Sequence, residues 1–156
     1  SLYATQQGHT TPKIDVRGVV FDEDKILLVQ EKLDGMRWTL PGGWADVGES
    51  AGESTAREVW EETGYHVRAI KLLALYDRNK HDHPPYLFHA YKAFFRCELT
   101  GVAQTLHASN TESGESRWFD EAAIDGLELS VGRVTAAQIH RFYAHLRSPN
   151  LPTDFD

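Results

Sequence analysis

Three glutamates lie within five residues near the middle of the chain, in the stretch REVWEETG. Glu58, Glu61 and Glu62 have no lysine among them, and Arg57 precedes them. Each residue of a helix turns by about 100°, so the three carboxylates fall on one face, where they repel one another. Carboxylate oxygens are ligands that Mg²⁺ and Mn²⁺ prefer. The pattern predicts a divalent metal site; the alternative is a solvated acidic face with Arg57 offsetting its neighbours.

A metal ion would also supply positive charge that the chain as a whole lacks. Its 156 residues hold 16 Lys and Arg against 23 Asp and Glu, for a net charge of -7. This balance argues against a general electrostatic footprint for nucleic acid or an anionic membrane. We therefore expect neither partner. An anionic small-molecule substrate would need a local source of positive charge.

Cysteine content and hydropathy bear on the compartment. Cys97 is the only cysteine, so an intramolecular disulfide is excluded, and its apolar surroundings predict a small buried strand residue. No apolar run approaches the roughly 18 residues that a membrane helix needs, and no signal-peptide pattern begins the chain. We expect a soluble, cytoplasmic protein from a reducing compartment.

The acidic stretch lies on the strongest helix pattern of the chain, residues 50–63. Ser50 and Glu53 form a capping box, and Gly64 provides a stop. An apolar stripe with helical spacing should face a core, opposite the three carboxylates. The stripe consists of Ala56, Val59, Trp60 and Thr63.

Strand patterns surround this helix and predict one domain. They cover residues 13–21, 25–32, 37–40, 66–78, 86–99 and 117–119, and a second amphipathic helix covers 134–147. This order favours an α/β (α+β) fold in which a mixed sheet lies between helices, an α/β/α sandwich. We expect an N-terminal segment at 1–12, the domain at 13–147 and a flexible tail at 148–156, whose two prolines and two acids follow the last helix.

The spacing around the glutamates resembles the Nudix hydrolase box, G-x5-E-x7-R-E-U-x-E-E-x-G-U, where U is a bulky aliphatic residue. Gly43, Glu49 and the run from Arg57 to Gly64 supply every fixed residue, and Tyr65 replaces the usual final aliphatic residue. The resemblance implies a Nudix-type α/β/α sandwich over nearly the whole chain. The stretches TPKIDVRG, LPGGWADVGES and YDRNKHDHPP are similar to bacterial ADP-ribose pyrophosphatase-like members, some of which favour CDP-alcohols. Lys80 stands where the ADP-ribose enzymes usually have proline.

The resemblance also implies roles for the box residues. Glu58, Glu61 and Glu62 are expected to bind Mg²⁺, with Mn²⁺ able to substitute, and Arg57 to orient them. The carbonyl of Gly43 joins the ligands in many members. From the residues themselves, Gly42 and Gly43 suit a backbone that approaches a metal or phosphate closely, and Glu49 suits a bidentate pair with Arg57.

The proton acceptor and the substrate contacts lie partly outside the box. Glu61 and Glu62 are the first candidates for the acceptor, and Glu112 and Glu115 of the late loop TESGESRWF are the second. The candidates for substrate contact are Arg17, Trp44, Asp77, Arg78 and His81. Histidines 81, 83 and 89 lack the further spacing of a zinc site, so we expect a substrate-facing turn there.

The predicted function is Mg²⁺-dependent hydrolysis of a nucleoside diphosphate linked to another group, such as ADP-ribose, a CDP-alcohol or a nucleotide sugar. The products would be a nucleoside monophosphate and a phosphorylated partner. A Nudix-fold sensor that binds without turnover, and a MutT-like enzyme that removes oxidised nucleoside triphosphates, remain alternatives. An isoprenyl diphosphate isomerase would need a reactive cysteine, for which Cys97 is poorly placed. The sequence leaves the oligomeric state open, with a homodimer as one alternative.

Overall fold

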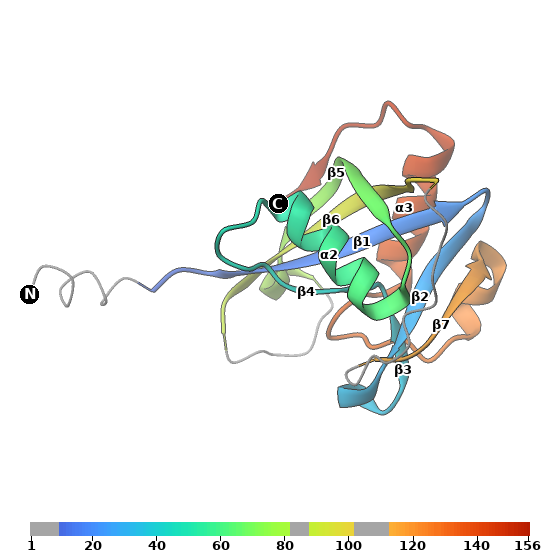
Figure 1. Ribbon diagram of the computed structural model, residues 1–156, viewed down its shortest axis with the longest axis horizontal. Helices are drawn as coiled ribbons and strands as arrows, with labels where there is room; N and C mark the ends of the chain where they lie inside the picture. The colour runs from blue at the N-terminus through green and yellow to red at the C-terminus, as the bar shows by residue number, and fades with distance from the viewer. Residues whose placement is uncertain (1–9, 82–87, 102–112) are drawn as a thin grey trace, which may run out of the picture.

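A mixed β-sheet with a helix on each face forms the protein (Figure 1). The computed structural model describes residues 10–81, 88–101 and 113–156. Within these residues the strands are β1 (Lys13–Asp22), β2 (Lys25–Glu31), β3 (Arg37–Thr39), β4 (Gly42–Trp44), β5 (Val67–Asp77), β6 (Ala90–Leu99), β7 (Ser113–Asp120) and β8 (Asp154–Phe155). The helices are α2 (Ala51–Thr63) and α3 (Ala136–Arg147), with 3-10 turns at Lys32–Asp34, Arg78–Lys80 and Glu121–Gly126. The predicted α/β fold with a mixed sheet between helices is confirmed.

The strand order is β3-β2-β1-β6-β5-β8, with β4 also paired to β1 and β7 to β2. The pairs β1–β6 and β5–β8 are parallel, and the other pairs are antiparallel. β1 changes partner along its length. Its first half pairs with β4, where Arg17 lies opposite Gly42, and its end pairs with β2, where Phe21 lies opposite Ile26. β1 and β2 therefore diverge at the end of the sheet where β4 lies.

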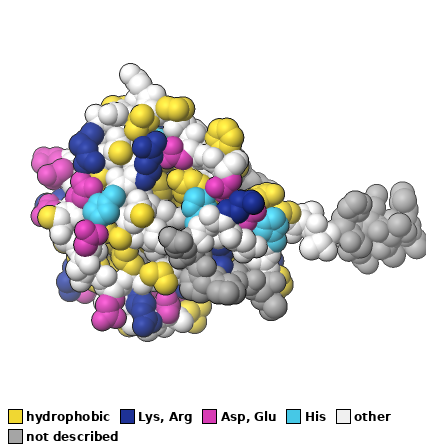
Figure 2. Space-filling model, turned by 180° about the vertical axis from the view of Figure 1, so that it is seen from behind, with side chains coloured by type: hydrophobic (Ala, Val, Ile, Leu, Met, Phe, Trp, Pro, Cys, Tyr) yellow, Lys and Arg dark blue, Asp and Glu magenta, His cyan; other side chains and the backbone are white. Residues whose placement is uncertain are grey.

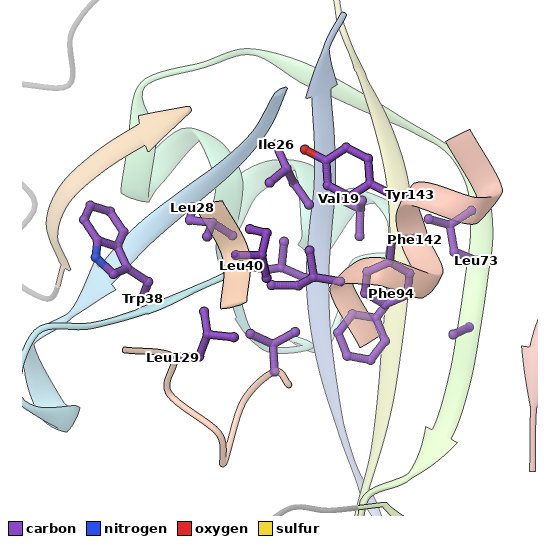
Figure 3. Close-up of a cluster of buried hydrophobic side chains, with 14 of the residues drawn as sticks. Val19, Ile26, Leu28, Trp38, Leu40, Leu73, Phe94, Leu129, Phe142 and Tyr143 are labelled. Carbon is purple, nitrogen blue, oxygen red and sulfur yellow. The ribbon is translucent and has the colours of Figure 1, made fainter. Parts of the chain in front are cut away.

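Side chains of β1 alternate between two buried layers, as expected for a central strand with both faces covered. Val19 belongs to the layer under α3, and the next residue, Val20, belongs to the layer under α2. Figure 3 shows the first layer, where Phe142 and Tyr143 of α3 lie near Val19 and Phe94. The rings of Phe94 and Phe142 have centroids 4.8 Å apart. The sheet is thus fixed from both sides.

The helix that carries the glutamates begins and ends as predicted. Ser50 accepts a hydrogen bond from the backbone of Glu53, the Glu53 carboxylate accepts one in return, and Gly64 ends the helix at φ 78°. One member of the predicted apolar stripe is wrong: Trp60 is 39% exposed, whereas Val59 is fully buried. The stripe that faces the sheet is therefore narrower than the sequence predicted.

Two strands were missed by the sequence prediction. β4 is three residues long and contains Gly42 and Gly43, so it has neither the length nor the composition of a strand, and its pairing with β1 makes it one. β8 is two residues long. The limits of the predicted strands also shift: β6 begins at Ala90 rather than at residue 86, and β7 extends back to Ser113.

Residues 148–156 correct the prediction of a flexible tail. Asp154 accepts hydrogen bonds from Arg141 of α3 at 2.8 Å, and Lys71 of β5 donates to the carbonyl of Leu151 at 2.6 Å. β8 then adds to the edge of the sheet beside β5. Prolines and acids suggested fraying, but tertiary contacts with β5 and α3 decide the conformation here.

The face of the molecule on the α3 side carries acidic and basic side chains together rather than one sign of charge (Figure 2). In the described part of the chain, no helix is long and apolar enough to cross a membrane.

We expect Gly18→Ala to destabilise the fold by about 1–3 kcal/mol, because β1 and α2 approach too closely for a larger residue. A Cβ atom at position 18 would lie 2.5 Å from Cγ2 of Val59. Gly126→Ala is the matched control, since nothing lies within 4 Å of its Cβ position. Urea unfolding should show a loss for the first variant and a change of no more than about 1 kcal/mol for the second. Equal stability of the two variants would contradict this packing.

Candidate functional site

Two glutamates of α2, one helical turn apart, reach the backbone of β4. The amide of Gly42 donates a hydrogen bond of 2.8 Å to Oε2 of Glu62. The carboxylate of Glu58 lies 3.0 to 3.2 Å from the point where a Cβ atom on Gly43 would stand. The carboxylates of the helix and the backbone of the strand therefore meet in one place.

This approach requires glycine at both positions of β4. A Cβ atom on Gly42 would lie 2.0 Å from the carbonyl oxygen of Val16 in β1. On Gly43 it would press against the Glu58 carboxylate. The absence of a side chain at Gly42 lets β4 pair with β1, and its absence at Gly43 leaves the carboxylate accessible from the strand.

Arg57 holds three carboxylates at once. Its Nε atom donates to both oxygens of Glu49 at 3.0 and 3.1 Å, and its Nη1 atom donates to Glu58 at 3.1 Å and to Glu61 at 3.2 Å. Ser54 adds a hydrogen bond of 2.9 Å to Glu49. Burial lowers the pKa of Arg57, but these carboxylates outweigh it and raise the pKa above its ordinary value. The predicted pair between Glu49 and Arg57 is present, and it ties the loop before α2 to the helix.

The three glutamates are not equivalent. Burial raises the pKa of Glu58 above its ordinary value, in spite of the opposing charge of Arg57. Glu61 points more toward solvent, with 47% of its side chain exposed. Glu58 and Glu62 line the cleft described next, whereas Glu61 is not among its lining residues and reaches the cluster through Arg57.

A cleft of about 450 Å³ opens beside the two glutamates. It is lined by Arg17, Glu31, Leu33, Gly42, Gly43, Trp44, Ala45, Asp46, Arg57, Glu58, Glu62 and Arg133. In the described ranges, no three Asp, Glu, His or Cys side chains converge closely enough to hold a metal as they stand. The donor chemistry nevertheless fits a hard divalent cation, because two carboxylates and a side-chain-free backbone share one cleft. The charge of such an ion would also offset the cost of burying the ionised Glu58 carboxylate.

A smaller pocket of about 150 Å³ adjoins the cleft. It is lined by Asp15, Arg17, Gly43, Trp44, Arg78, Ala90, Lys92, Gly132 and Arg133. Four of these residues, Arg17, Gly43, Trp44 and Arg133, also line the cleft, so the two spaces lie side by side. Of the predicted substrate residues, Arg17 and Trp44 therefore face both spaces, and Arg78 faces the smaller one.

Three of the other predicted residues lie away from both spaces. Asp77 pairs with His89 at 3.1 Å, and His81 pairs with Asp156 at 2.8 Å. Glu115 forms a two-bond pair with Arg117 on β7, both bonds 2.9 Å long. None of the three lines the cleft or the smaller pocket. Glu112, the other candidate acceptor on that loop, lies outside the described residues.

Sequence reasoning missed three charged residues of the smaller pocket, which are Asp15, Lys92 and Arg133. Asp15 of β1 lies opposite Lys92 of the parallel strand β6, and the two side chains form an ion pair of 2.5 Å. Both side chains are buried. A charged residue inside an apolar strand pattern was the available signal, since such residues are rarely buried without a partner.

Comparison with known proteins agrees with this geometry. A profile described as the NUDIX domain matches residues 11–141. The chain belongs to the NUDIX family. The match contains the whole box, all of α2 and the first half of α3, and it confirms the family resemblance read from residues 43–65. As a member with an intact box, the chain is a hydrolase that acts on diphosphate bonds.

Three proteins similar to this NUDIX chain carry names that describe diphosphate hydrolysis. A Bacillus subtilis (strain 168) protein named as a candidate ADP-ribose pyrophosphatase, YjhB, is 40% identical over 99% of this chain and 72% of its own length. The crystal structure of an ADP-ribose pyrophosphatase from Streptococcus suis 89-1591 has 38% identity and a TM-score of 0.79, covering 94% of this chain and all of that one. A UDP-X diphosphatase structure has 27% identity and a TM-score of 0.80, covering all of this chain and 75% of that one.

We expect Arg57→Lys to lower the hydrolysis rate by about 100-fold with little loss of stability, because lysine cannot hold the carboxylates in the same geometry. Arg117→Lys is the matched control, since Arg117 also pairs with a glutamate but lies outside the cleft. Steady-state kinetics and melting temperatures of both variants test this. A rate for Arg57→Lys that equals that of Arg117→Lys would show that the Arg57 network does not position the site.

Proposed function

We propose that this NUDIX hydrolase is a divalent-metal-dependent pyrophosphohydrolase. It would cleave the diphosphate of a nucleoside diphosphate linked to a sugar, ribose or alcohol, and release a nucleoside monophosphate and a phosphorylated partner. The observation that carries the proposal is the meeting of Glu58 and Glu62 with the Gly42–Gly43 backbone in one cleft. Mg²⁺ is the proposed ion, and Mn²⁺ would substitute for it.

The proposed ligands are Glu58, Glu62 and the carbonyl of Gly43. Glu61 is a further proposed ligand, because Nη1 of Arg57 donates hydrogen bonds to both Glu58 and Glu61 and so keeps them close together. A bound divalent ion supplies Lewis acidity, charge neutralisation of phosphate oxygens and a more acidic water. Glu49 and Arg57 fix the orientation of the carboxylates before the substrate arrives. This order in the site lowers the reorganisation needed during the reaction.

The residues of the chain would then position the substrate and accept a proton. Glu61 or Glu62 is the proposed acceptor, because Glu115 is paired with Arg117 outside the cleft. Arg17 lies between the cleft and the smaller pocket, where its positive charge would hold diphosphate oxygens. Trp44, which lines both spaces, offers a face on which a base or sugar would stack.

The names of the three relatives described above favour a nucleotide linked to another group over a nucleoside triphosphate. Two of them are named for ADP-ribose, and a third is a UDP-X diphosphatase. A sensor without turnover is the second candidate. It is disfavoured because a sensor has no need of the complete set of box carboxylates and of the arginine that holds them.

A substrate panel tests the proposed activity. ADP-ribose, CDP-choline, UDP-glucose, a dinucleoside polyphosphate and oxidised dGTP are incubated with Mg²⁺ or Mn²⁺, and the products are separated by chromatography. We expect release of a nucleoside monophosphate from at least one linked diphosphate, and none after chelation of the metal. Binding without cleavage of any compound would favour the sensor, and cleavage of oxidised dGTP alone would favour the MutT-like alternative.

Metal binding should also raise stability, because the ion binds the folded carboxylates and finds no preformed site in the unfolded chain. At one hundred times its dissociation constant an ion contributes about 2.7 kcal/mol. We expect millimolar Mg²⁺ to raise the melting temperature by a few degrees and to have no such effect on a Glu58→Gln, Glu62→Gln double variant. A Glu115→Gln variant, altered outside the cleft, serves as the control. Scanning fluorimetry measures all three, and an undiminished shift in the double variant would remove Glu58 and Glu62 from the metal site.

A further inference from the structure

The smaller pocket beside the cleft is unusual in its charge. Of its nine lining residues, four are basic and one is acidic. The basic residues are Arg17, Arg78, Lys92 and Arg133, and the acidic residue is Asp15. In a chain with a net charge of -7, basic side chains predominate among the residues that line this space. We call this space the basic pocket.

Three of the basic side chains are buried, so their charges are expensive to maintain. Lys92 is 2% exposed, Arg17 5% and Arg78 7%. Asp15 accepts hydrogen bonds from both Arg17 and Lys92, at 2.9 and 2.5 Å, and so one carboxylate serves two cations. Burying charge costs stability, and three buried cations around one space are suited to contact with an anionic ligand.

The pKa shifts of Lys92 and Asp15 agree with a basic pocket that is electropositive inside. Burial, together with the charges of Arg17 and Arg78, lowers the pKa of Lys92 to about 8 in spite of the Asp15 carboxylate. Burial alone would raise the pKa of Asp15, but Arg17 and Lys92 hold it below its ordinary value. The Asp15 carboxylate is thus ionised, and it already accepts hydrogen bonds from both Arg17 and Lys92. Lys92 remains largely protonated at neutral pH.

The fourth basic residue places the basic pocket next to the reaction. Arg133 lies 3.8 Å from Glu31 and 3.9 Å from Asp34, at the rim, and it lines both the pocket and the cleft. One substrate molecule could therefore place its diphosphate in the cleft and a group linked to that diphosphate in the basic pocket. The volume of the basic pocket, about 150 Å³, suits a small group and not a second nucleoside.

We propose that the basic pocket selects substrates that carry a further anionic group, a phosphomonoester or a carboxylate, outside the diphosphate that is cleaved. This inference rests on the proposed hydrolysis of a linked nucleoside diphosphate. Lys92 and Arg78 hold the anionic oxygens, and Arg17 separates them from the cleft. A neutral sugar or alcohol would make no charged contact with Lys92 and Arg78, so it is the poorer substrate.

Two matched pairs of compounds test the preference and distinguish the two kinds of anion. UDP-glucuronate and UDP-glucose differ in one carboxylate, and ADP-ribose 2′-phosphate and ADP-ribose differ in one phosphate. We expect kcat/KM to be at least about tenfold higher for the charged member of one pair. Lys92→Met, which keeps most of the length of the side chain and removes its charge, should bring that ratio close to one. Lys25→Met, at an exposed lysine on the far end of β2, should leave the ratio unchanged.

A measurement without metal or turnover tests the pocket by itself. With the metal chelated, inorganic phosphate at matched ionic strength should raise the melting temperature of the wild type and of Lys25→Met by the same few degrees, and that of Lys92→Met by less. Arg133→Gln replaces Lys92→Met in both experiments if the latter does not fold, since Arg133 lies at the rim.

The outcomes separate this inference from the proposed function. Equal kcat/KM within both pairs, or an equal phosphate shift in Lys92→Met and the wild type, overturns the basic pocket while hydrolysis of linked diphosphates stands. No cleavage of any of the four compounds, with a phosphate shift that depends on Lys92, overturns the proposed function for these substrates and leaves the pocket as an anion site.

Discussion

The close approach of β4 to the glutamates of α2 is the constraint on which the site depends. β4 can pair with β1 only because Gly42 has no side chain, and its amide then lies 2.8 Å from Glu62. Gly43 leaves space against Glu58 in the same way. A larger residue at either position would move the strand away from the helix or displace a carboxylate. The two glycines therefore couple the sheet pairing to the geometry of the cleft.

Placing like charges together on a helix costs stability, and the surrounding structure limits that cost. Arg57 contacts Glu49, Glu58 and Glu61, so one guanidinium serves three acids. The capping box, the glycine stop and the burial of Val59 stabilise α2 independently of its acidic face. The helix can thus tolerate three carboxylates that repel one another on a single face.

The sequence predicted the parts of the protein that depend on local signals. The cap at Ser50 and the stop at Gly64 locate α2, and the box spacing locates the glutamates that meet β4, because these patterns act within a few residues. β4 could not be predicted, since its three residues become a strand only by pairing with β1. The Asp15–Lys92 pair was missed for a related reason: it depends on the parallel register of two strands that are distant in sequence.

The same register explains how acidic and basic sites coexist at one end of the sheet. Alternation along β1 turns Asp15 and Arg17 toward the α3 side, where Lys92 of β6 meets them. Glu58 and Glu62 approach β4 from α2, and Arg17 lines the spaces on both sides. A cleft with carboxylates suited to a cation thus adjoins a pocket with basic side chains suited to an anion. A substrate whose diphosphate is bound through a cation and whose far end is itself anionic matches both charges, which a neutral linked group does not.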